Sequence, residues 1–308
     1  MKNLVALFFF FPFILSAQHT SKQGKDISIS PMIDGTILVP KTNEKPPLAI
    51  LIGGSGPIDR DGNQQMMKNN SLRFLAEGLY ENNIAAFRYD KRIVKQLKDR
   101  TLNEESISFD DFIQDAIDVI DYFKRSNAFS KVYVIGHSQG SLVGMIAAQK
   151  RADGYISIAG AGQEIDDVIV DQLKSQAPGL ADNARTSFDD MRANGVAVNY
   201  SPGLSSIFRP QIQPFLITWM KYNPQTEISK LDIPVLIING EKDVQVQISE
   251  AEKLKEASTN AQYEIIPLMN HVLKEIEGDS IENSKSYNEP NRPVIPKLIE
   301  VISAFIIE

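Results

Sequence analysis

Val132-Tyr133-Val134-Ile135-Gly136-His137-Ser138-Gln139-Gly140 is the stretch of sequence that decides the fold of this chain. Its apolar run predicts a buried strand, and the following residues 141–148 (SLVGMIAA) predict a helix. A strand, a Gly-x-Ser-x-Gly turn and a helix in this order are the pattern of a nucleophile elbow. The glycines at both ends avoid clashes in a tight turn, and the new helix points free N–H groups toward the serine. Because the short motif also occurs by chance, its interpretation depends on the rest of the chain.

The composition is that of an ordinary globular protein. The chain has 308 residues, of which 43% are hydrophobic and 23% are charged, so it can bury a sizeable core. Its net charge of −7 argues against a nucleic-acid partner, because phosphate binding requires clustered Lys and Arg. The one short basic run, residues 88–98, is interrupted by Asp90 and by apolar residues. We interpret this run as the end of a strand followed by a solvated helix face.

The N-terminus has the pattern of a secretory signal peptide. Lys2 precedes an apolar run, and the small residues Ser16 and Ala17 then offer a cleavage point. We therefore expect residues 1–17 to be removed and the protein to be exported, periplasmic or extracellular, with no stable membrane insertion afterwards. An uncleaved anchor is the alternative, but the run is shorter than the roughly 20 apolar residues of a spanning helix. The chain contains no cysteine, which excludes disulfides, a lipid-bearing cysteine and a thiol nucleophile.

Apolar runs of strand length alternate with amphipathic stretches along the chain. From Leu48 onward the runs are mostly continuous, which is typical of parallel strands buried on both faces. The stretches between them have helical spacing, which predicts helices on both faces of a sheet. We therefore predict an α/β fold with a mostly parallel, eight-stranded sheet, whose first two strands form an antiparallel hairpin at one edge. The runs are residues 27–29, 36–39, 48–52, 84–89, 132–135, 155–159, 235–239 and 262–266.

One segment, residues 162–230, contains no strand candidate. Residues 165–173 are amphipathic and predict a helix, and the pair Pro178-Gly179 is expected to interrupt the pattern that follows. The simplest interpretation is a small helical cap inserted into a core made of residues 18–161 and 231–308. Such a cap would lie at the strand ends where Ser138 is expected and would shape a substrate pocket.

A serine nucleophile requires a base that titrates near neutral pH, and histidine is the usual one. His19 lies beside the predicted signal peptide, and His137 adjoins the serine within the elbow, where we expect it to point elsewhere. The remaining histidine, His271, follows the last strand candidate and is the predicted base. Asp243, in the loop after residues 235–239, is our choice for the acid that orients this base, with Glu241 as the competitor.

A glycine-rich sequence, Gly53-Gly54-Ser55-Gly56-Pro57, follows the strand at residues 48–52. Glycines let the backbone approach a reacting carbonyl oxygen closely. An oxyanion hole takes one N–H group from the residue after the nucleophile, here Gln139, and a second from such a loop. Ser55 is the expected second donor, with Gly54 as the alternative. A phosphate-binding loop is excluded because no Gly-Lys-Ser/Thr sequence follows.

These motifs together resemble those of bacterial α/β-hydrolases, in the group of esterases, dienelactone hydrolases and S33 aminopeptidase-like proteins. The resemblance covers residues 48–306 and implies Ser138 as nucleophile, Asp243 as acid and His271 as base, in the chain order of that superfamily. Gly53 and Ile93 depart from the pattern of many relatives, which bears on the shape of the acyl pocket. The motifs that carry the resemblance are Gly53–Pro57 with Asp59–Asn63, Arg88–Arg92, Gly136–Gly140, Gly240–Asp243 and Asn270-His271.

The run Asp59-Arg60-Asp61-Gly62-Asn63 has two interpretations. Asp and Asn side chains stabilise turns, whereas the functional interpretation is an active-site wall or a loop clamp. Asp59 and Asp61 alone fall short of the about six to eight oxygen ligands that Ca²⁺ takes. We therefore predict no metal and no cofactor.

The sequence predicts an exported serine hydrolase that cleaves a small-molecule carboxylic ester through an acyl-enzyme. An S33-type aminopeptidase or amidase is the first alternative. It would need a group in the cap that binds a free amine, for which Asp166, Asp167 and Asp171 are candidates. The alternative from another class is a non-catalytic binding protein, but such proteins usually lose a triad member or the elbow glycines.

Overall fold

The computed structural model describes residues 24–258 and 260–308, so the predicted signal peptide at residues 1–17 and His19 lie outside the described residues. The described strands form one eight-stranded sheet in the order β1-β2-β4-β3-β5-β6-β7-β8. β2 pairs antiparallel with β1 and with β4, and the other neighbouring strands pair in parallel. The predicted fold class is confirmed, including the antiparallel hairpin at one edge. The strands are β1 (Lys25–Ser30), β2 (Ile33–Leu38), β3 (Leu48–Ile52), β4 (Ala85–Tyr89), β5 (Val132–His137), β6 (Gly154–Ile158), β7 (Val235–Gly240) and β8 (Gln262–Ile266).

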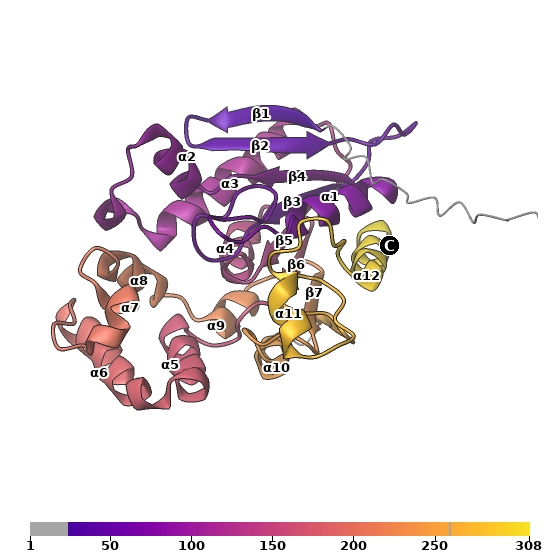
Figure 1. Ribbon diagram of the computed structural model, residues 1–308. Coiled ribbons are helices and arrows are strands. Elements are labelled where there is room, and N and C mark those ends of the chain that lie inside the picture. The colour runs from indigo at the N-terminus through magenta and orange to yellow at the C-terminus, as the bar shows by residue number, and fades with distance from the viewer. Residues whose placement is uncertain (1–23, 259) are drawn as a thin grey trace, which may run out of the picture.

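Helices cover both faces of this sheet (Figure 1). Every residue of β3 is buried, and successive side chains point to opposite faces because a strand has a period of two. Leu48 and Ile50 belong to the apolar cluster that includes residues of α3, α4 and α10, whereas Ala49 and Leu51 belong to the cluster that includes residues of α1 and α12. The helices of the core are α1 (Ser71–Glu81), α2 (Arg92–Asp99), α3 (Phe109–Ser126), α4 (Gln139–Ala148), α10 (Ile248–Ala257), α11 (Ser280–Ser286) and α12 (Pro296–Ile307), with the short 3-10 helix η1 (Glu104–Ser106).

Residues 162–230, which we call the helical insertion, connect β6 to β7. In Figure 1, α5 to α8 form one group beside the sheet, and an apolar cluster that includes Phe188 and Phe208 holds them together. The Trp219 ring of the insertion stacks on Phe109 of the core, with 5.3 Å between ring centroids. The elements of the insertion are α5 (Ile165–Gln176), α6 (Pro178–Asn194), η2 (Pro202–Leu204), α7 (Ser205–Phe208), α8 (Gln213–Trp219) and α9 (Pro224–Ile228).

The pair Pro178-Gly179 interrupts the helical pattern as expected, because α5 ends at Gln176 and a new helix begins at Pro178. It opens α6, with Pro178 in the first turn. The first N–H groups of a helix have no partner within the helix, so proline loses nothing at this position. Among the described residues, no helix combines the length and the apolarity that crossing a bilayer requires.

Candidate active site

Ser138 lies in a sharp turn between the end of β5 and the start of α4. Its backbone angles are φ 55° and ψ −122°, a conformation that is costly for any residue with a side chain. The turn brings the chain so close to its neighbours that only glycine fits on either side. A Cβ atom on Gly136 would lie 2.2 Å from the carbonyl oxygen of Gly140, and one on Gly140 would lie 2.4 Å from that of Ile52. The turn therefore has the backbone of a nucleophile elbow.

The structure brings His271 and Asp243 together from the loops that follow β8 and β7. His271 Nδ1 lies 2.8 Å from Asp243 Oδ2, and both side chains are buried. The other oxygen of the Asp243 carboxylate accepts the N–H groups of Gln245 at 2.8 Å and Val246 at 2.9 Å. These bonds hold the carboxylate, and Nδ1–H donation to it leaves Nε2 of His271 as the free acceptor. The competitor Glu241 is exposed to solvent.

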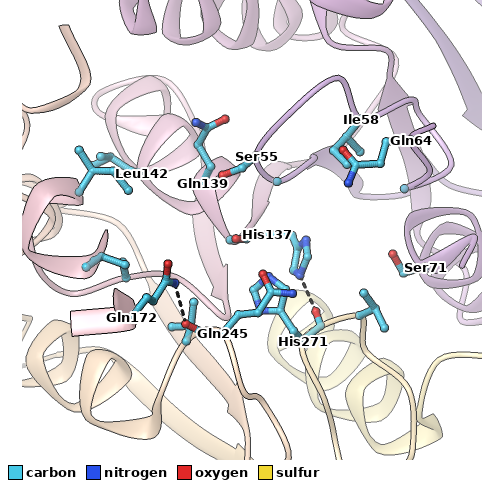
Figure 2. A pocket seen from close by; sticks show the side chains of 18 of the residues that line it. Ser55, Ile58, Gln64, Ser71, His137, Gln139, Leu142, Gln172, Gln245 and His271 are labelled. Carbon is cyan, nitrogen blue, oxygen red and sulfur yellow. Dashed lines mark hydrogen bonds between the residues drawn. The ribbon is translucent and has the colours of Figure 1, made fainter. Parts of the chain in front are cut away.

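A cavity of about 420 Å³ joins the predicted site residues. Ser138, His271, Gln139, Ser55 and Gly54 all line it. Figure 2 shows Ser55 and Gln139 side by side, apart from His271. Among the described residues, the lining of this first cavity includes no Asp, Glu, Lys or Arg, and carboxamides are its commonest polar side chains. The carboxamides are Gln64, Asn69, Gln139, Gln163, Gln172 and Gln245.

His137 does not point away from the site, which corrects our expectation. Its ring lies 4.9 Å from the His271 ring between centroids, and its Nε2–H donates to the carbonyl oxygen of His271 at 2.8 Å (Figure 2). Burial, reinforced by the neighbouring His271, lowers the pKa of His137 to about 4. His137 is therefore neutral near pH 7, and it holds the backbone of the loop that carries His271.

The loop after β3 packs against the elbow. A Cβ atom on Gly54 would lie 3.2 Å from Ser138 Cβ, so the backbone of this loop passes next to the serine. Lys91 also contacts this loop. Its Nζ donates to the carbonyl oxygen of Gly54 at 2.9 Å and to Gln139 Oε1 at 2.6 Å.

Lys91 is a site residue that the sequence analysis missed. We interpreted residues 88–98 as a strand end and a solvated helix face, but Arg88, Asp90 and Lys91 are buried. The strand end is correct, since β4 ends at Tyr89. The helix face is also solvated as expected, since Val94 is the one buried residue of α2. Arg88, Asp90 and Lys91 precede this helix and are buried, with Asp61 as the ion-pair partner of Arg88 and Arg60 as that of Asp90. An alternation of charged and apolar residues reads like a surface helix, and the partners come from other parts of the chain.

The run at residues 59–63 forms a turn that its own side chains stabilise. Asp59 Oδ1 accepts the N–H groups of Asp61 at 2.9 Å and of Asn63 at 2.8 Å. Asn63 Oδ1 in turn accepts the N–H groups of Asn69 and Asn70. These contacts favour the turn interpretation. In the part of the chain that the structure describes, no group of three or more His, Cys, Asp or Glu residues could hold a metal ion.

The three acids considered for amine binding line neither this cavity nor the second one that adjoins it. Asp166 is buried and pairs with Arg185 and Arg192, both within the insertion. Asp167 also pairs with Arg185, and Asp171 pairs with Lys174. All three carboxylates therefore bind neighbouring cations of the insertion instead of facing Ser138.

A comparison with known protein families agrees with this geometry. The model of the serine aminopeptidase S33 family matches residues 69–277, which is more than half of the chain. The chain belongs to this family. A curated relative, esterase EstD of Thermotoga maritima, is 30% identical over 276 residues, which cover 84% of this chain and 62% of EstD. The S33-family chain therefore spans less than two thirds of the length of that relative.

Solved structures support the fold. Est1E of Butyrivibrio proteoclasticus superposes with a TM-score of 0.59 at 18% identity, covering 93% of this chain and 100% of Est1E. A bromoperoxidase of Bacillus anthracis gives 0.53 at 15% identity, covering 93% and 100%. A dienelactone hydrolase of Anabaena variabilis gives 0.51 at 15% identity, covering 94% and 98%. The S33-family chain thus has the α/β-hydrolase fold.

Proposed function

We propose that this protein is a serine hydrolase that cleaves carboxylic esters through an acyl-enzyme. Ser138 Oγ adds to the ester carbonyl carbon, and His271 Nε2 takes the hydroxyl proton. The N–H groups of Ser55 and Gln139 bind the oxyanion, with Gly54 as the alternative to Ser55. The alcohol leaves with the proton from His271. Water then adds to the acyl group through the same base and releases the carboxylic acid and free Ser138.

One observation carries the proposal: the elbow serine and a histidine already oriented by a buried carboxylate line the same cavity. A buried His–Asp pair is costly to desolvate unless it is well hydrogen-bonded, and here the Asp243 carboxylate accepts three hydrogen bonds. Non-catalytic members of such folds have no use for this pair. The arrangement therefore supports an enzyme over a binding protein.

The absence of charge in the lining of the first cavity, along the described residues, favours an ester over an N-terminal peptide substrate. An aminopeptidase must bind a protonated amine, and a desolvated ammonium group requires a carboxylate partner. The acids that we considered for this role are paired with Arg185, Arg192 and Lys174. The curated relative EstD is named an esterase, which agrees with this choice.

A second cavity, of about 430 Å³, is suited to bind an apolar acyl group. It adjoins the first through Ser55, Gln139, Ile169 and Trp219, which line both. His271 lines only the first cavity, and the alcohol must lie near His271 to receive its proton. The acyl group is therefore assigned to the second cavity, whose lining is mostly aliphatic and aromatic, with Phe215 and Leu97 among its residues.

The test compares the wild-type protein with Ser138→Ala on p-nitrophenyl butyrate and on an aminoacyl naphthylamide. We expect the wild type to cleave the ester faster than the amide and to bind a fluorophosphonate probe covalently. Ser138→Ala should lose both turnover and labelling while keeping its unfolding midpoint. Ester turnover that persists in Ser138→Ala would contradict the assignment, and a preference for the naphthylamide would favour the aminopeptidase.

We also propose export, on the sequence pattern of residues 1–17 alone. Cell fractionation of the native host and N-terminal sequencing of the purified protein test it. An intact N-terminus on protein from the cytoplasm would contradict it.

A further inference from the structure

Lys91 lies between the two peptide segments that supply the proposed oxyanion donors. It follows β4, immediately before α2, and its side chain runs into the core. Its Nζ donates to the Gly54 carbonyl oxygen at 2.9 Å and to Gln139 Oε1 at 2.6 Å. The same nitrogen lies 4.3 Å from the centroid of the Phe112 ring, whose face attracts a cation. One buried amine thus binds both the loop after β3 and the residue after the nucleophile.

The hydrogen bond from Lys91 to the Gly54 carbonyl oxygen fixes the direction of the Ser55 N–H group. Gly54 C=O and Ser55 N–H belong to one peptide unit, and in a trans peptide these two groups point in opposite directions. No cis peptide bond occurs among the described residues. Lys91 lines the second cavity but not the first, whereas Ser55 and Ser138 both line the first. A carbonyl directed at Lys91 therefore leaves the Ser55 N–H directed away from Lys91.

The hydrogen bond from Lys91 to Gln139 Oε1 holds the residue that supplies the other proposed oxyanion donor. Gln139 is the first residue of α4, and its backbone N–H is the second proposed oxyanion ligand. Figure 2 shows its side chain beside Ser55 and turned away from His271. A bond from Lys91 to the end of this side chain ties the start of α4 to the loop after β3. Movement of either segment would break one of the two bonds.

We propose that Lys91 is a positioning residue that holds the Ser55 and Gln139 N–H groups in register for the oxyanion. This inference rests on the proposed function, because it assigns to Lys91 a part in that same reaction. Lys91 does not touch the substrate carbonyl. It acts through the two segments, so its effect appears when the carbonyl oxygen becomes negatively charged and not when the ester binds.

A buried lysine suits this task in either protonation state. Burial lowers the pKa of Lys91 to about 7. The ammonium group has three N–H donors and the neutral amine has two, so both bonds persist across that pKa. A methionine of similar length would fill the space and leave both oxygens without this donor. An arginine would keep the donors but widen the head group.

The experiment measures kcat and KM for p-nitrophenyl butyrate in Lys91→Met, with each kcat normalised by active-site titration with a fluorophosphonate. We expect kcat to fall by about tenfold to hundredfold, less than when an oxyanion donor is deleted outright, while KM stays within about threefold. Affinity for a boronic acid, which forms a tetrahedral anion on the serine, should fall by the same factor as kcat/KM. Lys91→Arg should recover part of kcat. Lys98→Met, the same change at an exposed position of α2, is the matched control and should behave as wild type.

A structural role alone would reduce the titrated fraction of active protein but leave kcat per titrated site unchanged, and this result would overturn the inference. Unchanged boronate affinity alongside a lower kcat would also overturn it. If Lys91→Met does not fold, Gln139→Met is used instead, because it removes one of the two bonds of Lys91 and should lower kcat by a smaller factor. An unchanged kcat in Gln139→Met would also overturn the inference. The proposed function fails separately, if the wild type cleaves no ester and the probe does not label Ser138, and the inference then fails with it.

Discussion

His137→Phe tests how the buried His137 couples stability to pH. The folded protein lowers the pKa of His137 from 6.5 to about 4, chiefly by burial, and the unfolded chain restores the ordinary value. Between these two pH values the unfolded state binds a proton that the folded state does not, so stability falls as pH falls. One pKa unit corresponds to about 1.4 kcal/mol, so the wild type loses about 3 kcal/mol from this group across the window. Above pH 6.5 His137 is neutral in both the folded and the unfolded state, so this loss of stability is absent.

Phenylalanine places another aromatic ring at this position but cannot donate a hydrogen bond to the carbonyl oxygen of His271. Above pH 6.5 we expect His137→Phe to be less stable than the wild type by about 1–3 kcal/mol, the cost of an unsatisfied buried acceptor. Near pH 4 this difference should shrink by about 3 kcal/mol, because the variant has no histidine to protonate at this position. Urea unfolding followed by circular dichroism at several pH values measures both quantities.

Tyr155→Phe is the matched control for this measurement. Tyr155 is buried and hydrogen-bonded to Ser141, and burial raises the pKa of its hydroxyl, so it does not titrate in acid. This variant should lose stability by an amount that does not change between pH 6.5 and pH 4. A difference between wild type and His137→Phe that stays constant over the same window would refute the reasoning about His137.

Three further changes give distinct expected results. Gly140→Ala places a Cβ atom 2.4 Å from the Ile52 carbonyl oxygen and should cost about 1–3 kcal/mol of stability in urea unfolding. Gly144→Ala, whose nearest contact would be 3.0 Å, is its milder control, and equal midpoints would contradict the clash. Asp243→Asn should lower kcat by about a thousandfold to ten-thousandfold with a near-native midpoint, and a loss below tenfold would exclude the orienting role. Leu97→Trp narrows the second cavity and should lower kcat/KM for p-nitrophenyl octanoate at least tenfold while sparing the acetate ester; parallel losses on both esters would place the acyl group elsewhere.

The sheet was predictable because its signal is local. Residues 48–52 and 132–135 are continuous apolar runs, which are typical of central parallel strands buried on both faces. Ser138 was predictable from the glycines two positions before and after it, Gly136 and Gly140. The pairing of His271 with Asp243 instead of Glu241 was a choice among few candidates, and the hydrogen bond agrees with it.

The remaining features depend on contacts between distant segments. Lys91 binds Gly54 and Gln139, which lie 37 and 48 positions away in the chain. Sequence periodicity contains no information about such partners, so a buried lysine looked like a solvated one. His137 was misread for the same reason, because its partner is the backbone of His271, 134 positions away. Prediction therefore succeeded for groups whose neighbours are local and failed for polar groups buried by remote ones.

The topology of the sheet also has a consequence for biosynthesis. The elbow follows β5 near the centre of the sheet, whereas Asp243 and His271 follow β7 and β8 at the opposite edge from the N-terminal hairpin. A growing chain can therefore form the turn around Ser138 long before its histidine leaves the ribosome. Any chain that stops before His271, through truncation or proteolysis, has an elbow without a base. Under the proposed mechanism, the hydrolase stays inert until His271 has been synthesised and its loop has folded.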